Sequence, residues 1–371
     1  YVSLIYYIIL SLILIFSLLE FFNEEKIDRN IFFAIVILMA LVAGLACAIS
    51  PDWYAYFETY YYSLRVDWKD VEFWSEMSGM EKGYLRLNKL FTLFGFGFGM
   101  LTLFIASFSL YLKSTIFYKY GGFPLLVLFI YAMPNYLFEE HIHIRQGLAN
   151  GFAIYSARYI IDRKLIKFLL CIVIGFQFHE SIIVFVLAYW IAPMKFDEKV
   201  IGWLVIFAII GFYTGLNSII EVIMKFMPIG QDKFEDYQGD LYNSDGFALG
   251  DFIKIISVLS IIIYNKYAKH DKLYCYFRNL FIMGVLLFFF LGKGIFGIRL
   301  PGFYLVFLGL TLGRMLYVFD GDKFKRAFIY SSFVLYTVIL IFWFQIKQGK
   351  QARFNQYKTI FDKEAIYGLW I

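Results

Sequence analysis

The sequence predicts an all-α, polytopic membrane protein. Its 371 residues are 61% hydrophobic and 22% aromatic, and the mean hydropathy is +0.68, whereas a soluble domain is roughly 45–50% apolar. No globular core could bury this excess, so much of it must face lipid. Helices satisfy their own backbone hydrogen bonds and are the expected form for such segments.

The apolar segments have lengths that suit membrane helices, because a hydrocarbon core of ~30 Å needs roughly 20 helical residues. Runs that reach or approach this length are Leu4–Phe22, Ile31–Ile49, Phe123–Tyr136, Val200–Leu216 and Phe328–Phe344. The first run lacks the basic start and the cleavage site of a signal peptide, so we expect it to remain as a helix. The cysteines lie in or beside apolar runs and predict no disulfide framework.

Lysine and arginine concentrate in alternate short connections, which the positive-inside rule places in the cytoplasm. These connections are Asn23–Asn30, Lys113–Gly122, Arg158–Lys167, Asn265–Arg278 and Arg314–Arg326. They can share one side only if Leu165–Ala192 crosses the membrane twice, or dips in and returns. Gln177-Phe178-His179-Glu180 interrupts this segment, so we predict a hairpin of two short helices whose apex near His179 faces outside.

The hairpin brings the predicted total to about twelve crossings, with both termini outside. Residues 1–371 then form a single integral membrane domain. Its extracytoplasmic parts are loops at about 50–89 and 217–251 and a tail at 345–371.

The densest group of polar residues, Glu139–Ala149, lies where one apolar run ends and another begins. Charge is costly in hydrocarbon, so such a group is a candidate site. Arg145 and Gln146 open the next helix, where a fixed cation beside unpaired N–H groups suits an anion such as a diphosphate. The alternative is that Arg145 only reaches lipid headgroups. The further expected substrate contacts in this group are Glu140, His141 and His143.

Two more polar positions are candidates for the same site. His179 is either an acid–base catalyst or a structural group, and Glu180 either contacts substrate or caps the second short helix. Arg299 follows a glycine-rich segment that contains Lys293, and two cations beside a broken helix favour an anion site. Anchoring at the membrane interface is the competing explanation for both cations.

Aromatic residues and carboxylates are mixed through residues 50–89. Aromatic rings stack on the C–H faces of sugars, and sugar hydroxyls need acceptors, so this composition suits a carbohydrate. An interfacial aromatic belt explains most of the rings equally well. Asp52 and Glu81 are the carboxylates that we expect to contact sugar.

Several short motifs follow one another in a fixed order. They are Pro51-Asp52-Trp53-Tyr54-Ala55-Tyr56, Glu81-Lys82-Gly83-Tyr84, Ile144-Arg145-Gln146-Gly147-Leu148-Ala149, Phe178-His179-Glu180-Ser181-Ile182-Ile183, and Ile298-Arg299-Leu300 with Phe303-Tyr304 shortly after. In this order and spacing the chain resembles the EpsG-like branch of the Wzy polysaccharide polymerases. Lys82 departs from the pattern, because proline often stands there in the family.

The resemblance implies a GT-C-like fold and an inverting, metal-independent glycosyltransferase at the outer face of the bacterial cytoplasmic membrane. A glycan on undecaprenyl diphosphate would be transferred to a second lipid-linked repeat unit. Arg145 and Arg299 would stabilise the diphosphate leaving group, and Tyr304 would contact substrate. The base on the acceptor hydroxyl would be His179 or a carboxylate. A chain-length regulator and a flippase are the protein partners that such a system implies.

Two other functions remain open. An O-antigen-ligase-like transferase would use the same donor with a different acceptor. A lipid-oligosaccharide flippase would need paired ionisable residues near the middle of the membrane and repeated halves, whereas these charges cluster at one face. No zinc, P-loop, dinucleotide or RNA-binding motif is present. We therefore expect no cofactor, no metal and no nucleic-acid partner, and we expect membrane lipids around the chain.

Overall fold

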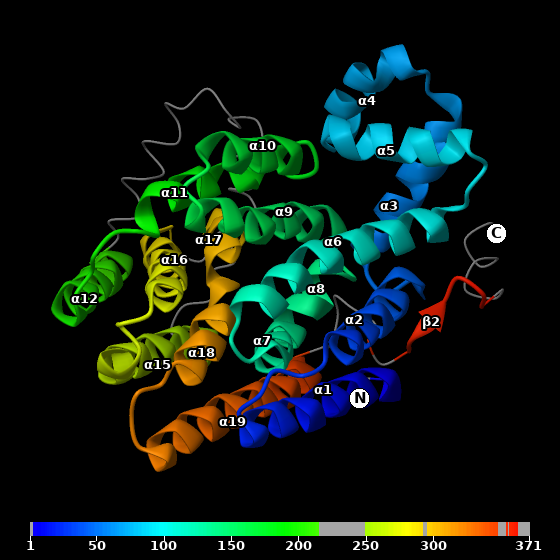
Figure 1. Ribbon diagram of the computed structural model, residues 1–371. Coiled ribbons are helices and arrows are strands. Elements are labelled where there is room, and N and C mark those ends of the chain that lie inside the picture. The colour runs from blue at the N-terminus through cyan, green and yellow to red at the C-terminus, as the bar shows by residue number, and fades with distance from the viewer. Residues whose placement is uncertain (1–2, 215–248, 292–294, 348–353, 355, 363–371) are drawn as a thin grey trace.

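The computed structural model describes residues 3–214, 249–291, 295–347, 354 and 356–362; the remainder is the grey trace in Figure 1. In the first half of the chain the helices are α1 (Leu4–Asn23), α2 (Arg29–Gly44), α3 (Pro51–Tyr62), α4 (Val71–Ser78), α5 (Lys82–Leu93), α6 (Phe98–Tyr120), α7 (Pro124–Tyr131), α8 (Leu137–Glu139) and α9 (Ile144–Ile161). They are followed by α10 (Leu165–Phe176), α11 (Ala188–Ile191), α12 (Glu198–Thr214), α15 (Leu249–Tyr264), α16 (Lys272–Leu291), α17 (Ile295–Leu305), α18 (Phe307–Tyr317) and α19 (Lys323–Lys347).

Short elements join these helices. Four are 3-10 helices, namely η1 (Ser63–Arg65), η2 (Trp68–Asp70), η4 (Glu180–Leu187) and η5 (Asn265–Tyr267), and η3 (Ala132–Tyr136) is a π-helical turn. The described strands are β1 (Ala46–Cys47) and β2 (Lys358–Thr359), which pair antiparallel. Among the described residues the regular structure is therefore helical apart from one short strand pair, as the composition predicts.

Within the described residues, five helices are long and apolar enough to cross a membrane. They are Leu4–Asn23, Phe98–Tyr120, Lys272–Leu291, Arg299–Tyr317 and Lys323–Phe344. Shorter apolar helices are Arg29–Gly44, Pro124–Glu139, Leu165–Phe176 and Glu180–Ile191. The membrane class follows from these helices, while the predicted number of crossings stays a prediction.

The segment Leu165–Ala192 doubles back on itself, as its interrupted sequence predicts. α10 and η4 pack against each other, and Arg163 Nη1 donates to the Tyr189 carbonyl oxygen (2.6 Å), so the two ends of the hairpin lie together. The 12 residues of α10 span ~18 Å, less than the ~30 Å of hydrocarbon. Each arm is thus shorter than the hydrocarbon thickness, and a hairpin that crosses twice and one that dips in and returns both leave the chain on the side where it entered. Such a hairpin leaves the orientation of the following helices unchanged.

Segments near the two ends of the chain contact each other at one end of the bundle, where β2 lies at the right in Figure 1. The Ser3 N–H donates to the Phe354 carbonyl oxygen (2.8 Å), and β1, which follows α2, pairs with β2 of the tail. The His141 ring, just before α9, contacts the ring of Phe354. These contacts place Ser3 and Phe354 at the same end of the bundle as the loop that precedes α3, and the side of the membrane on which the termini lie stays a prediction.

The structure corrects one element of the predicted topology. The sequence predicts a cytoplasmic turn over residues 113–122, but α6 continues to Tyr120. The Lys113 side chain is fully buried and ion-paired with Glu139 (2.7 Å) and Glu140 (2.6 Å). Lys113 therefore does not belong among the cations of the positive-inside pattern, whereas Lys119 near the end of α6 does.

Candidate functional site

The candidate site lies where four helices begin. α3, α5, α9 and η4 start at Pro51, Lys82, Ile144 and Glu180. The Tyr84 N–H in the first turn of α5 donates to the Gln177 carbonyl oxygen at the hairpin apex (3.2 Å). A Cβ at Gly83 would lie 2.5 Å from that oxygen, which explains the glycine. Helix N-termini carry partial positive charge, so their convergence favours an anion.

Arg145, in the first turn of α9, is held in place by groups from two other helices. Its Nη1 atom forms an ion pair with Oε2 of Glu81, the N-cap of α5. Its guanidinium lies 5.6 Å from the centre of the Tyr56 ring and 5.9 Å from that of Tyr84. Arg145 Nε is buried and has no hydrogen-bond partner among the described residues. The result is a fixed cation with aromatic walls and one unused donor.

His143, the N-cap of α9, faces Asp52 in the first turn of α3. His143 Nε2 and Asp52 Oδ2 are 3.7 Å apart, and both side chains are nearly half exposed. Burial lowers the pKa of His143; Asp52 raises it, Arg299 and Arg145 lower it, and the net shift is downward from the ordinary value. The imidazole is therefore neutral at neutral pH, and a neutral imidazole can accept a proton.

Gln146 connects the start of α9 to α17. Its Nε2 donates to the Arg299 carbonyl oxygen (3.3 Å) and lies 3.6 Å from the position that a Cβ at Gly302 would take. Both Arg145 and Arg299 are close enough to His143 to lower its pKa. The structure thus brings the two predicted cations to the same end of α9.

His179 and Glu180 lie at the hairpin apex, beside Glu81. His179 Nδ1 accepts from the Ser181 N–H (3.3 Å) and caps η4. A neutral ring that accepts at Nδ1 carries its proton on Nε2, so Nε2 is a donor rather than a base. The Glu180 N–H donates to Glu81 Oε1 (3.4 Å). Glu81 therefore contacts both α9 and the hairpin.

A family model described as the EpsG family matches residues 29–359. The chain belongs to the EpsG family. The match spans the motifs that carry the resemblance and the helices that form the site, and the family indicates a membrane protein with a polymerase role in polysaccharide biosynthesis. No curated protein and no solved structure matches the chain.

Two of the expected substrate contacts lie in the interior of this EpsG-family protein. Glu140 is 2% exposed and accepts from Lys113, Ser109 and Tyr131 at 2.6–3.0 Å. His141 is 4% exposed, and its ring packs between those of Tyr6 and Tyr136. Both side chains hold helices together here and do not face the site. The sequence could not show this, because Lys113 lies on another helix.

The other expected contacts differ in their placement. Tyr304 is fully buried, and its hydroxyl donates to the Val184 carbonyl oxygen (2.8 Å), so it joins α17 to η4. Lys293 lies outside the described residues, as does most of the loop predicted at 217–251. No group of three or more His, Cys, Asp or Glu side chains in the described ranges could hold a metal ion.

Sequence reasoning missed a cavity beside the site in the EpsG-family chain. It has a volume of about 700 Å³ and is lined by Glu58, Thr59, Tyr62, Arg65, Val66, Asp70, Phe73, Trp74, Met77 and Ser78. These residues belong to α3, α4 and the turns between them, which Figure 1 shows at one edge of the bundle. Thr59 Oγ1 contacts Met80 Sδ (3.5 Å), and Met80 directly precedes Glu81. The mixture of carboxylates and aromatic rings in residues 50–89 indicated a carbohydrate site, but the sequence did not show which of these side chains line the same cavity.

Proposed function

We propose that this EpsG-family protein is a polysaccharide polymerase that transfers a glycan from undecaprenyl diphosphate to a second lipid-linked repeat unit. The observation that carries the proposal is the fixed cation at the start of α9, ion-paired with Glu81 and joined to the Arg299 segment through Gln146. A diphosphate gains negative charge as it leaves. Preorganised cations and helix N-termini stabilise such charge because they need no reorganisation.

The transfer is a single displacement with inversion. The acceptor hydroxyl attacks the anomeric carbon as the bond to the diphosphate oxygen breaks, and undecaprenyl diphosphate leaves with that electron pair. His143 takes the hydroxyl proton, and Asp52, 3.7 Å away, stabilises the imidazolium that results. The proposal includes a GT-C-like fold and a reaction that needs no metal ion, both of which the family resemblance implies.

The cavity of about 700 Å³ between α3 and α4 is the proposed acceptor subsite. Sites for organic ligands are typically ~300–1,000 Å³, so the cavity has room for a short oligosaccharide. Trp74 and Tyr62 offer ring faces, while Glu58 and Asp70 offer acceptors for hydroxyls. The site faces the exterior, because the basic turns lie at the other end of the helices.

Polymer length in bacterial cells that depend on this protein tests the proposal. Arg145→Ala and Arg299→Ala should each abolish long polymer and leave single-repeat glycan intact, with the amount of each variant in the membrane measured alongside. Lysine should rescue poorly, because an ammonium lacks the bidentate fork. Arg86→Ala is the matched control, since Arg86 is exposed on α5. Normal ladders from both site variants would overturn the diphosphate assignment.

The two alternative functions predict other results. A ligase would transfer preformed polymer to an acceptor that is not a lipid-linked repeat unit. A flippase variant would trap single-repeat lipid on the cytoplasmic side. Product analysis with the lipid-linked repeat unit as the only substrate separates all three, because only a polymerase lengthens the glycan.

A further inference from the structure

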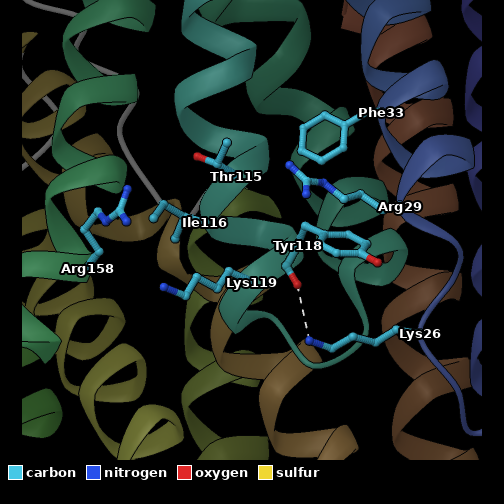
Figure 2. Close-up of a pocket in the computed structure, with 8 residues that line it drawn as sticks. All are labelled: Lys26, Arg29, Phe33, Thr115, Ile116, Tyr118, Lys119 and Arg158. Carbon is cyan, nitrogen blue, oxygen red and sulfur yellow. Dashed lines mark hydrogen bonds between the residues drawn. The ribbon is translucent and has the colours of Figure 1, made fainter.

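A pocket with four cations lies toward the end of α9 that is farthest from the candidate site. Its volume is about 430 Å³, and it is lined by Lys26, Arg29, Phe33, Thr115, Ile116, Tyr118, Lys119 and Arg158. Figure 2 shows Lys26 and Arg29 on one side of α6 and Arg158 on the other. Arg158 lies 13 residues after Arg145, or ~20 Å along the helix. The pocket is thus separate from the proposed catalytic site.

The part of the chain that the structure describes offers the cations of this pocket no carboxylate partner. Among the described residues, none of the four forms a salt bridge, and no acidic residue lines the pocket. Nearby carboxylates are occupied by backbone groups: Glu20 accepts from the N–H groups of Ile27 (3.0 Å) and Leu125 (2.9 Å), and Asp28 caps α2.

Two arginines in other predicted cytoplasmic turns are paired with carboxylates. Arg314 binds Asp271 (2.6 Å), and Arg326 binds Glu24 (2.8 Å). In the pocket, aromatic rings take the place of carboxylates. Lys26 Nζ lies 5.9 Å from the centre of the Tyr118 ring and Arg29 5.6 Å from that of Phe33. Four like charges around one hollow repel each other, and an anion in the hollow would relieve that repulsion.

An apolar groove continues from the pocket. Its volume is about 270 Å³, and it is lined by Phe33, Val36, Ile37, Ala40 and Leu41 of α2 and by Ser107 and Tyr111 of α6. Phe33 lines both hollows. From Phe33 to Leu41 the groove follows α2 for ~12 Å, away from the cations, and no charged residue lines it. A ligand that fills both hollows is anionic at one end and apolar at the other.

We propose that the pocket and the groove together bind an anionic phospholipid of the cytoplasmic leaflet. The phosphate headgroup lies among Lys26, Arg29, Lys119 and Arg158, and one acyl chain follows the groove between α2 and α6. Basic pockets between membrane helices on the cytoplasmic side recognise lipid headgroups by this charge complementarity. A soluble phosphate compound would use the pocket alone, so the groove favours a lipid.

Lipid binding by the purified full chain tests the proposal. Native mass spectrometry would follow titration with phosphatidylglycerol, phosphatidylcholine or glycerol phosphate. The triple variant Arg29→Gln/Lys119→Gln/Arg158→Gln should bind phosphatidylglycerol on the order of 100-fold more weakly, at about fivefold per charge. The charge-matched control is Lys266→Gln/Lys272→Gln/Lys323→Gln, at exposed lysines of other basic turns, and it should bind like the unchanged protein.

The groove has its own variants. Ala40→Leu narrows it and Tyr111→Ala removes one wall, so each should weaken phosphatidylglycerol binding, and a melting temperature measured without lipid checks that each is folded. Equal weakening by both triple variants would overturn the pocket assignment. Phosphatidylcholine bound as tightly as phosphatidylglycerol would overturn the recognition of charge. Glycerol phosphate bound as tightly as the lipid would mean a soluble phosphate ligand and would overturn the lipid proposal.

Discussion

Arg145 and Glu81, 64 residues apart in the sequence, form an ion pair that joins the start of α9 to the start of α5. The other oxygen of Glu81 accepts from the backbone N–H of Glu180. One carboxylate therefore fixes three helix starts relative to each other. This gives Glu81 a role that differs from direct contact with sugar, because it positions the cation that we assign to the diphosphate.

Glu81→Ala should therefore affect the protein much as loss of Arg145 does. Removal of one partner from a buried pair costs about 3–5 kcal/mol of stability, because it leaves the other charge unpaired. We expect unfolding in detergent at lower temperature and loss of long polymer. The double variant Glu81→Ala/Arg145→Ala should cost less than the sum of the single variants. Strict additivity in this double-mutant cycle would show that the pair is not coupled.

The exposed pair of Glu72 and Lys82 is the control for this prediction. Lys82 Nζ and Glu72 Oε1 lie 2.5 Å apart, but the side chain of Glu72 is 70% exposed and that of Lys82 is 42% exposed. Because water and salt screen such pairs, Glu72→Ala should leave both the melting temperature and the polymer unchanged.

The pH–rate profile of the transfer should fall on its acidic side because His143 becomes protonated there. The transfer rate at saturating substrate should fall as pH drops through the pKa of His143, which burial and the two arginines hold below the ordinary value. Asp52 raises this pKa, so Asp52→Asn should move this fall in rate to more acidic pH. His143→Gln should slow the reaction about 10²–10⁴-fold if the imidazole is the base, with His270→Gln as control. A slow His179→Gln variant beside a normal His143→Gln variant would assign the proton transfer to His179.

The sequence predicts the membrane class and the hairpin because these follow from composition and from the interruption at Gln177-Phe178-His179-Glu180. It also predicts that Arg145 and Arg299 belong to one site, although only through the order of the motifs. It could not predict that Glu140 faces Lys113 or that Glu81 pairs with Arg145. Such pairs depend on how helices pack side by side, and the spacing of residues along one helix carries no information about the neighbouring helix.

The buried pairing of Lys113 gives a prediction about stability. Lys113→Met leaves Glu139 and Glu140 without their cation, so the free energy of unfolding should fall by about 3–5 kcal/mol. Lys119→Met is the control on the same helix, because Lys119 forms no salt bridge among the described residues. Chemical unfolding in detergent, followed by tryptophan fluorescence, measures both. Equal stability of the two variants would mean that the network of Lys113 contributes nothing.

The orientation of the hairpin decides on which side of the membrane the site lies, and cysteine labelling tests it. In a chain whose Cys47, Cys171 and Cys275 are replaced, Ser181→Cys at the apex should react with a membrane-impermeant maleimide from outside intact cells. Lys195→Cys, in the exposed turn after the hairpin, should react only after the membrane is opened.

The physical reason is that α10 and η4 pack side by side, so the chain leaves the hairpin on the side where it entered. Outside labelling at both positions would contradict this orientation, because the helices after the hairpin would then be inverted. It would also place the basic turns at Asn265–Arg278 and Arg314–Arg326 outside, against the positive-inside rule.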